Sequence, residues 1–207
     1  MSAGTYLNAT KHLSKVDPIM AALISEWGPC TIKPNTDYYH SLVSSIISQQ
    51  LSVKAASTIE GRFVALFDGQ LPTPAMIVGT DPDTLRGVGL SGAKVRYVQD
   101  LAEHILDGRL VLSRLPELSN SEIIAELTAI KGIGEWTVHM FLMFCLGRLD
   151  VLPVGDLGIK MGIMKLYGLD HVPTPAEVKE AAEARGWAPY ESIAAWYVWR
   201  SLDNKTV

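Results

Sequence analysis

One carboxylate, Asp156, stands in the segment LPVGDLGIKM, residues 152–161, where its close neighbours are apolar residues and glycines. A carboxylate in such a setting serves either as a catalytic group or as the N-cap of a helix, since an Asp side chain accepts a hydrogen bond from an N–H of the first turn. The sequence from Asp156 to Gly168, DLGIKMGIMKLYG, has the pattern of a capped helix. The segment alone leaves both interpretations open.

Residues 127–138, LTAIKGIGEWTV, contain a Gly-x-Gly pair between two helical stretches. Glycine permits a tight turn with positive φ or a close backbone approach. Such a turn leaves unpaired N–H groups at the positive end of the next helix, and these form an anion site that suits a nucleic-acid phosphate. The alternative is a plain helix–helix connector in which the glycines only permit packing. The candidate phosphate-binding residues are Lys131, Gly132, Ile133 and Gly134.

Helical patterning extends over nearly the whole chain. Apolar residues recur at helical spacing, Ser, Thr or Thr–Pro marks several starts, and glycine marks several ends. No stretch alternates convincingly over several strands. We therefore predict an all-α protein of about ten helices joined by short loops. The clearest helical segments are 37–50, 52–69, 73–78, 91–108, 121–130, 135–147, 156–168, 174–186 and 190–203.

Residues 85–98 and 127–140 share a weak pattern in which an apolar helix end is followed by glycines and a second helix. The two segments are consistent with an old repeat of a helical hairpin. They are equally consistent with two ordinary glycine turns.

The composition indicates a globular protein with a substantial core. Of the 207 residues, 48% are hydrophobic and 19% are charged, which excludes a disordered chain. The formal net charge of −4 argues against a protein that coats nucleic acid without specificity. A local basic face stays possible, because net charge does not report how charge is distributed.

The two cysteines, Cys30 and Cys145, are too few for a four-thiolate iron–sulfur or zinc site. We expect Cys145, which lies in the apolar run MFLMFCLG, to be a core thiol. The pattern favours a reducing compartment, and a disulfide between the two cysteines is the alternative. The first twenty residues contain no long apolar run, so no secretion signal is expected, and no segment has the length of a membrane span.

The pattern L-x-x-I-x-G-I-G-x-W-T, followed some twenty residues later by LPVGDLGIKM, resembles the helix-hairpin-helix/Gly-Pro-Asp superfamily of DNA base-excision glycosylases. Within that superfamily the chain resembles the alkylbase, or 3-methyladenine DNA glycosylase II, branch in a short form. SLVSSIISQQLSVKAASTI at 41–59 and YESIAAWYVWR at 190–200 support the resemblance. The matches keep the family's order from about residue 17 to the C-terminus.

The resemblance implies a single glycosylase unit over 1–207, with two helical lobes and a central active cleft. One lobe would span 37–150 and contain the hairpin at 127–142. The other lobe would join 1–36 to 151–207.

The resemblance makes Asp156 the catalytic residue. A base leaves the sugar through an oxocarbenium-like transition state, and a nearby carboxylate stabilises that cation or orients water. Trp136 occupies the position of the nucleophilic lysine of base-excising lyases, which favours hydrolysis without strand cleavage. Its indole is also suited to a cationic alkylated base. Trp199 matches a second pocket aromatic, and Met140 stands where well-known relatives have tyrosine. The alternative for each tryptophan is a packing role.

Gln50 and Leu51 match the family's wedge loop, in which an apolar side chain fills the gap left by an extruded nucleotide. The alternative is a buried leucine that closes the turn, and Ser52 would cap the next helix. The carbonyls of Thr128, Ile130 and Ile133 match positions that hold a monovalent cation, Na⁺ or K⁺, in the family. Candidates for further phosphate contact are Lys33, Lys54, Lys94, Arg96, Lys160 and Lys165.

The resemblance implies a monofunctional DNA glycosylase for alkylated purines of the 3-methyladenine and 7-methylguanine type. It would flip the base out of duplex DNA, hydrolyse the N-glycosidic bond and leave an abasic site, with no required cofactor. We expect a monomer in the cytoplasm, near the nucleoid, or in the nucleus. The alternatives are a non-catalytic helix-hairpin-helix DNA-binding module and a glycosylase/lyase for other damaged bases. The histidines show no metal spacing, and His139 is expected to be structural.

Overall fold

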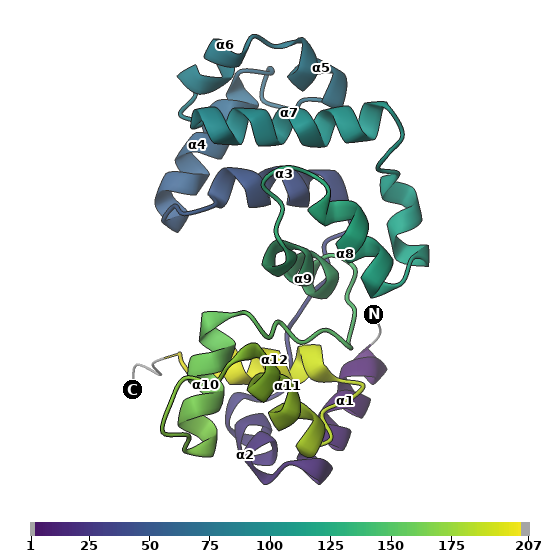
Figure 1. Cartoon of the computed structure of the whole chain (residues 1–207), viewed down its shortest axis with the longest axis vertical. Helices are drawn as coiled ribbons and strands as arrows, with labels where there is room; N and C mark the ends of the chain where they lie inside the picture. The colour runs from purple at the N-terminus through teal and green to yellow at the C-terminus, as the bar shows by residue number, and fades with distance from the viewer. Residues whose placement is uncertain (1–2, 204–207) are drawn as a thin grey trace. The chain divides into compact units, whose positions relative to one another are not determined.

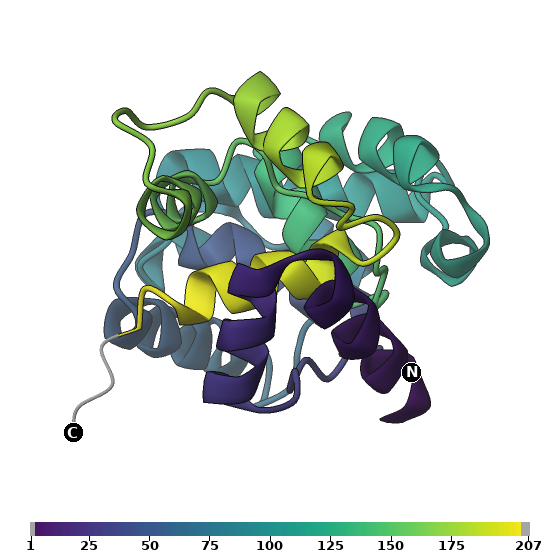
Figure 2. The ribbon, with the colours of Figure 1, turned by 90° about the horizontal axis from the view of Figure 1, so that it is seen from below.

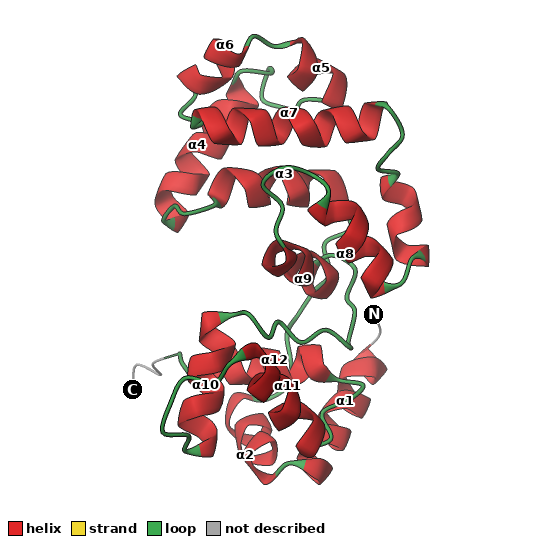
Figure 3. Cartoon of the chain, viewed as in Figure 1, coloured by secondary structure: helices red, strands yellow, loops and turns green. Residues whose placement is uncertain are grey.

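The computed structural model describes residues 3–203, with side chains from residue 6 onward. The described part of the chain forms twelve α-helices and one 3₁₀ helix, and none of its residues forms a strand (Figure 3). The all-α prediction is therefore confirmed. In the same part of the chain, no helix combines the length and the apolar character that crossing a membrane requires.

The chain divides into two compact units. The first unit contains the chain up to Pro34 and again from Leu142 onward, and the second unit is Asn35–Phe141. The predicted boundaries, after residues 36 and 150, lie two and nine residues beyond those of the structure. A backbone hydrogen bond ties Leu149 to the first unit, because its carbonyl accepts the N–H of Ser192 at 2.9 Å. Next to it, Val151 donates its N–H to the side-chain Oγ of Ser192 at 3.0 Å.

The first unit is built around α12, Glu191–Arg200, which is buried over nearly its whole length. A helix that is apolar all round requires cover on several faces. Figures 1 and 2 show α12 in yellow beside α1 and α2 in purple, and α10 also packs on it. The helices packed on α12 are α1 (Ala3–Val16), α2 (Pro18–Trp27) and α10 (Leu157–Tyr167), and α11 (Pro175–Ala184) packs on α10.

The buried carboxylate of Asp17 joins three parts of the first unit. It caps α2 through the N–H groups of Ile19 and Met20, and its other oxygen accepts the Tyr167 hydroxyl at 2.7 Å and the Trp187 indole N–H at 2.9 Å. A charge taken out of water is tolerated when hydrogen bonds replace its solvation. Asp17 therefore fixes the start of α2 against the end of α10.

The second unit has α7, Gly92–Leu106, as its central helix, with α3, α5 and α6 packed on it. Short side chains cap these helices: Ser91 accepts the N–H of Lys94, and Ser119 forms a capping box with Glu122. The other helices are α3 (Tyr38–Ser48), α4 (Val53–Ala65), α5 (Pro74–Gly79), α6 (Pro82–Gly87), η1 (Leu112–Glu117) and α8 (Asn120–Thr128); α9 (Glu135–Phe144) contains the boundary between the units.

The sequence prediction missed four of these elements, namely α1, α2, α6 and η1. Each of α6 and η1 is only six residues long, and η1 contains Pro116. The predicted Thr–Pro starts are confirmed, because Thr73 and Thr174 cap α5 and α11 with proline in the first turn.

Candidate active site and nucleic-acid interface

Asp156 ends a tight turn and begins α10. Its N–H donates to the carbonyl of Pro153 at 2.9 Å, and its Oδ1 accepts the N–H of Ile159 at 2.8 Å. The N-cap interpretation of Asp156 is therefore confirmed. The indole Nε1 of Trp199 donates to the same Oδ1 at 2.9 Å. Two N–H groups thus fix the orientation of a half-buried carboxylate.

Two glycines of α10 bring Trp199 to this carboxylate. A Cβ at Gly158 would lie 3.0 Å from both Asp156 Oδ1 and Trp199 Cδ1, and a Cβ at Gly162 would lie 2.4 Å from the Val198 side chain. The absence of a side chain at both positions lets α12 approach α10 closely. The ring of Phe144 stacks on Trp199 with centroids 6.2 Å apart. Trp199 is thus held on two sides.

The Gly-x-Gly segment forms a hairpin between α8 and α9. Gly132 has φ +82°, and a Cβ there would lie 2.2 Å from the ring of Tyr97, so only glycine fits. The N–H of Ile133 donates to the carbonyl of Ile130 at 3.1 Å, and both isoleucine side chains are buried. The hairpin is therefore anchored to the core of the second unit.

Gly134 directly precedes α9, and its carbonyl accepts the N–H of Val138 at 3.1 Å. The first N–H groups of a helix have no partner inside the helix. At the start of α7 the Ser91 side chain binds one of them, whereas Gly134 has no side chain that can do so. The start of α9 thus has the chemistry of an anion site.

The turn after α3 exposes Leu51. Gln50 has φ +56°, which is uncommon for a residue with a side chain, and Leu51 donates its N–H to Ser48 at 3.1 Å. Leu51 is 37% exposed, so the alternative of a leucine buried in the turn is wrong. Ser52 caps α4 through the N–H of Ala55, as expected.

Two side chains that the sequence did not assign to this turn hold it in place. The amide of Gln49 donates to the carbonyl of Gly132 at 2.7 Å. The ammonium of Lys94 donates to the carbonyls of Ile47 and Gln49 at 2.7 and 2.8 Å, and burial lowers its pKa. Lys94 was a candidate for phosphate contact, and the structure instead places its ammonium at the carboxyl end of α3.

Trp136 and Met140 lie one turn apart on α9. Trp136 is 53% exposed, which excludes the alternative of a core tryptophan, and Met140 is half-buried. His139 lies between these two residues in the sequence and is half-buried. Its Nε2 lies 3.6 Å from the Glu135 carboxylate. Burial lowers the pKa of His139, although Glu135 opposes the shift. Asp156, Trp199 and the phosphate candidates Lys33, Lys160 and Lys165 belong to the first unit, and the other predicted site residues belong to the second.

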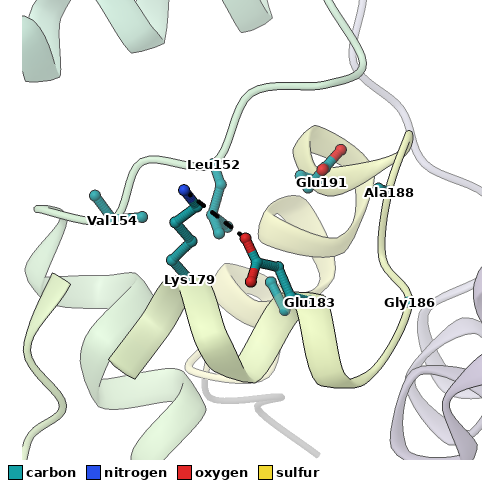
Figure 4. A pocket seen from close by; sticks show the side chains of 8 residues that line it. Leu152, Val154, Lys179, Glu183, Gly186, Ala188 and Glu191 are labelled. Carbon is teal, nitrogen blue, oxygen red and sulfur yellow. Dashed lines mark ion pairs between the residues drawn. The ribbon is translucent and has the colours of Figure 1, made fainter. Parts of the chain in front are cut away.

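The first unit also contains a pocket of about 240 Å³ next to the loop that leads to Asp156 (Figure 4). Leu152 and Val154 of that loop line it, and Lys179 and Glu183 of α11 form an ion pair of 3.8 Å at its wall. No predicted site residue is among those that line this pocket: Leu152, Val154, Lys179, Ala182, Glu183, Gly186, Ala188 and Glu191.

The glycine hairpin between α8 and α9 and the capped carboxylate of α10 define a helical protein of the helix-hairpin-helix class. A family model described as "HhH-GPD superfamily base excision DNA repair protein" matches residues 43–187. The chain belongs to this superfamily, and the predicted family is confirmed.

Two relatives from Schizosaccharomyces pombe cover most of the chain. "DNA-3-methyladenine glycosylase 1" is 37% identical over 195 residues, which are 92% of this chain and 85% of that protein. "Alkylbase DNA glycosidase-like protein mag2" is 34% identical over 200 residues, which are 94% and 93% of the two chains.

Two solved structures share the fold. One is the DNA-3-methyladenine glycosidase from Bacillus halodurans, with a TM-score of 0.84, 39% identity and coverage of 93% of this chain and 88% of that one. The other is the S. pombe 3-methyladenine DNA glycosylase Mag1 in complex with abasic DNA, with a TM-score of 0.81, 36% identity and coverage of 96% and 98%.

Proposed function

We propose that the protein is a DNA glycosylase that removes alkylated purines, of the 3-methyladenine and 7-methylguanine type, from duplex DNA. The observation that carries the proposal is the Asp156 carboxylate, which the Ile159 N–H and the Trp199 indole orient at the start of α10. A carboxylate held in one orientation requires little reorganisation when positive charge develops beside it. Relatives that match more than nine-tenths of the chain are named 3-methyladenine or alkylbase glycosylases or glycosidase-like proteins.

Asp156 would act on the sugar. As the bond to the base breaks, C1′ acquires oxocarbenium character, and the negative charge of Asp156 stabilises it or orients the attacking water. An alkylated purine is cationic and therefore already a good leaving group. Modest catalysis suffices, and the chemistry requires no redox cofactor or catalytic metal.

Trp136 supports a monofunctional reaction. An indole offers no amine that could attack C1′ and form a Schiff base, so the strand is not cleaved. The exposed ring instead presents an electron-rich face to a cationic base. Met140, one turn along α9, would add apolar surface to the base site of the second unit, and Trp199 is proposed as a pocket aromatic of the first unit.

The second unit would hold the DNA. The N–H groups around Gly132 and Gly134 would bind a phosphate, and Leu51, supported by Gln50, would fill the space of the flipped nucleotide. In the second unit the exposed phosphate candidates are Lys54 and Arg96; in the first unit Lys33 and Lys165 are exposed and Lys160 is half-buried.

The hairpin carbonyls of Thr128, Ile130 and Ile133 would hold Na⁺ or K⁺. The Ile130 carbonyl accepts one hydrogen bond, from the Ile133 N–H, and its second lone pair suits a ligand role. Neutral oxygen donors match a hard cation, which would add positive charge for a phosphate. We further propose that the protein acts as a monomer, in the nucleoid region or the nucleus.

The test compares wild type with Asp156→Asn on methylated duplex DNA, and measures released base and strand breaks without alkali. Asn retains an N-cap oxygen, so the fold of α10 is kept. The matched control is Asp81→Asn, which changes the N-cap of α6 in the other unit. We expect base release to disappear in Asp156→Asn and to persist in Asp81→Asn.

Undiminished release by Asp156→Asn would overturn the role of Asp156. Strand breaks without alkali would identify a glycosylase/lyase. DNA binding without release of any base by the wild type would identify a non-catalytic binding module.

A further inference from the structure

Lys131 of the hairpin forms an ion pair within the protein. The Lys131 ammonium donates to Asp100 Oδ1 at 2.9 Å, and the Lys131 backbone N–H donates to Asp100 Oδ2 at 2.9 Å. One carboxylate of α7 therefore binds the lysine at both its backbone and its side chain.

The side chains of Asp100 and Lys131 differ in their exposure to solvent. The Asp100 side chain is 9% exposed, whereas the Lys131 side chain is 70% exposed. Burial raises the pKa of Asp100, but the hydrogen bonds from Lys131 and the nearby charges lower it further, and the net shift is downward. The Nδ1 atom of His104 lies 3.5 Å from Oδ2. Asp100 is thus a fixed negative charge under the hairpin.

We propose that Asp100 is a positioning residue that holds the hairpin through the Lys131 N–H and cancels the charge of Lys131. The hairpin then binds a DNA phosphate with backbone N–H groups and gains no net electrostatic attraction from its lysine. The inference rests on the proposed function, because it concerns how the same hairpin binds DNA. It removes Lys131 from the set of charged phosphate contacts.

The physical argument is one of charge balance. A phosphate that approaches Lys131 meets a cation and, one hydrogen bond away, an anion of equal charge. A neutral pair releases no net counterion from DNA. Each cation that does neutralise a phosphate steepens the plot of log K against log[salt] by about 0.9. The slope of log K against log[salt] therefore shows whether Lys131 acts as a free charge.

The experiment measures the affinity for a fluorescent duplex that contains a tetrahydrofuran abasic-site analogue, at several NaCl concentrations. Lys131→Gln is made only together with Asp100→Asn, because alone it would leave the Asp100 charge unpaired beside the hairpin. Asp100→Asn keeps an acceptor for the Lys131 N–H but frees the ammonium, so its slope should steepen by about 0.9. This equals about a 3.5-fold additional loss of affinity between 50 and 200 mM salt. The double variant should return to the wild-type slope.

The matched control is Asp83→Asn, an exposed aspartate of the same unit that pairs with Arg86 at 3.3 Å. It changes the net charge by the same amount and should leave the slope unchanged. A slope that falls by about 0.9 in the double variant, or that stays constant in Asp100→Asn, would overturn the inference. A wild-type protein that binds no duplex at any salt concentration would instead contradict the proposed function.

Discussion

The side-chain amide of Gln49 donates a hydrogen bond of 2.7 Å to the carbonyl oxygen of Gly132. This bond joins the turn that exposes Leu51 to the hairpin that precedes α9. Both segments carry groups that we propose to contact DNA. The bond therefore fixes the position of the wedge residue relative to the phosphate-binding backbone.

Replacement of Gln49 by methionine is expected to weaken DNA binding with little change in side-chain size. The lost bond stabilises this arrangement of the turn by about 1 kcal/mol, so the increase in Kd for the abasic-analogue duplex has an upper bound of about fivefold. Fluorescence anisotropy measures this change. Gln70→Met, at an exposed glutamine of the same unit, is the control and should leave Kd unchanged. Equal affinities of wild type and Gln49→Met would contradict a positioning role.

Lys94 and Lys54 are expected to differ in their contribution to the free energy of unfolding. Lys94→Met removes two charge-assisted hydrogen bonds to carbonyls at the end of α3, so we expect a loss of about 2 kcal/mol in the free energy of unfolding. Lys54→Met, at an exposed position, should change stability by less than about 0.5 kcal/mol. Urea denaturation separates the two. If both variants are as stable as the wild type, Lys94 does not support the turn.

Long, periodic and capped segments of the fold were predictable from sequence. The capping box of Thr174 and the serine caps of α4 and α7 occur where the residue types indicated. The boundary between Phe141 and Leu142 was not predicted, because residues 142–150 join the first unit, where the Leu149 carbonyl accepts the N–H of Ser192, some forty residues away.

The candidate site was predictable only in part. The sequence marked Asp156 and the hairpin glycines, whose local roles follow from residue type. It did not indicate that Lys94 would bind carbonyls at the end of α3, or that Asp100 would bind Lys131, because each of these contacts joins distant segments. The i, i+4 spacing of Gly158 and Gly162 was a usable signal for close helix packing.

The stability that Asp100 provides should depend on pH. Its pKa is lowered in the folded protein, so its stabilisation is complete above its unfolded value of about 4 and is lost as the pH falls through the lower folded value. The groups that face it are Lys131 and His104. Wild type should therefore exceed Asp100→Asn in free energy of unfolding from pH 5 to 7, and the difference should shrink below about pH 4. Urea titrations at each pH measure it, and a difference that grows with acidity would contradict the assignment.

Alanine substitutions at the two glycines of α10 should distinguish the packing of α10 on α12 from the orientation of the Asp156 carboxylate. A Cβ at Gly162 meets the side chain of Val198 at 2.4 Å and its carbonyl oxygen at 3.2 Å, so Gly162→Ala should destabilise the protein by about 1–3 kcal/mol. A Cβ at Gly158 meets Asp156 Oδ1 and Trp199 Cδ1 at 3.0 Å. Gly158→Ala should therefore reduce base release more than it reduces stability.

The matched control for both glycines is Gly61→Ala in the interior of α4, where an added Cβ meets no atom within 4 Å. Alanine is the better helix former, so this variant should gain about 0.5–1 kcal/mol. Thermal unfolding of all three variants tests the helix packing, and their release of methylated base tests the orientation of Asp156. If Gly158→Ala released base at the wild-type rate, close contact between Trp199 and Asp156 would not be needed for catalysis. If Gly162→Ala were as stable as the wild type, α10 and α12 would not depend on a glycine at their contact.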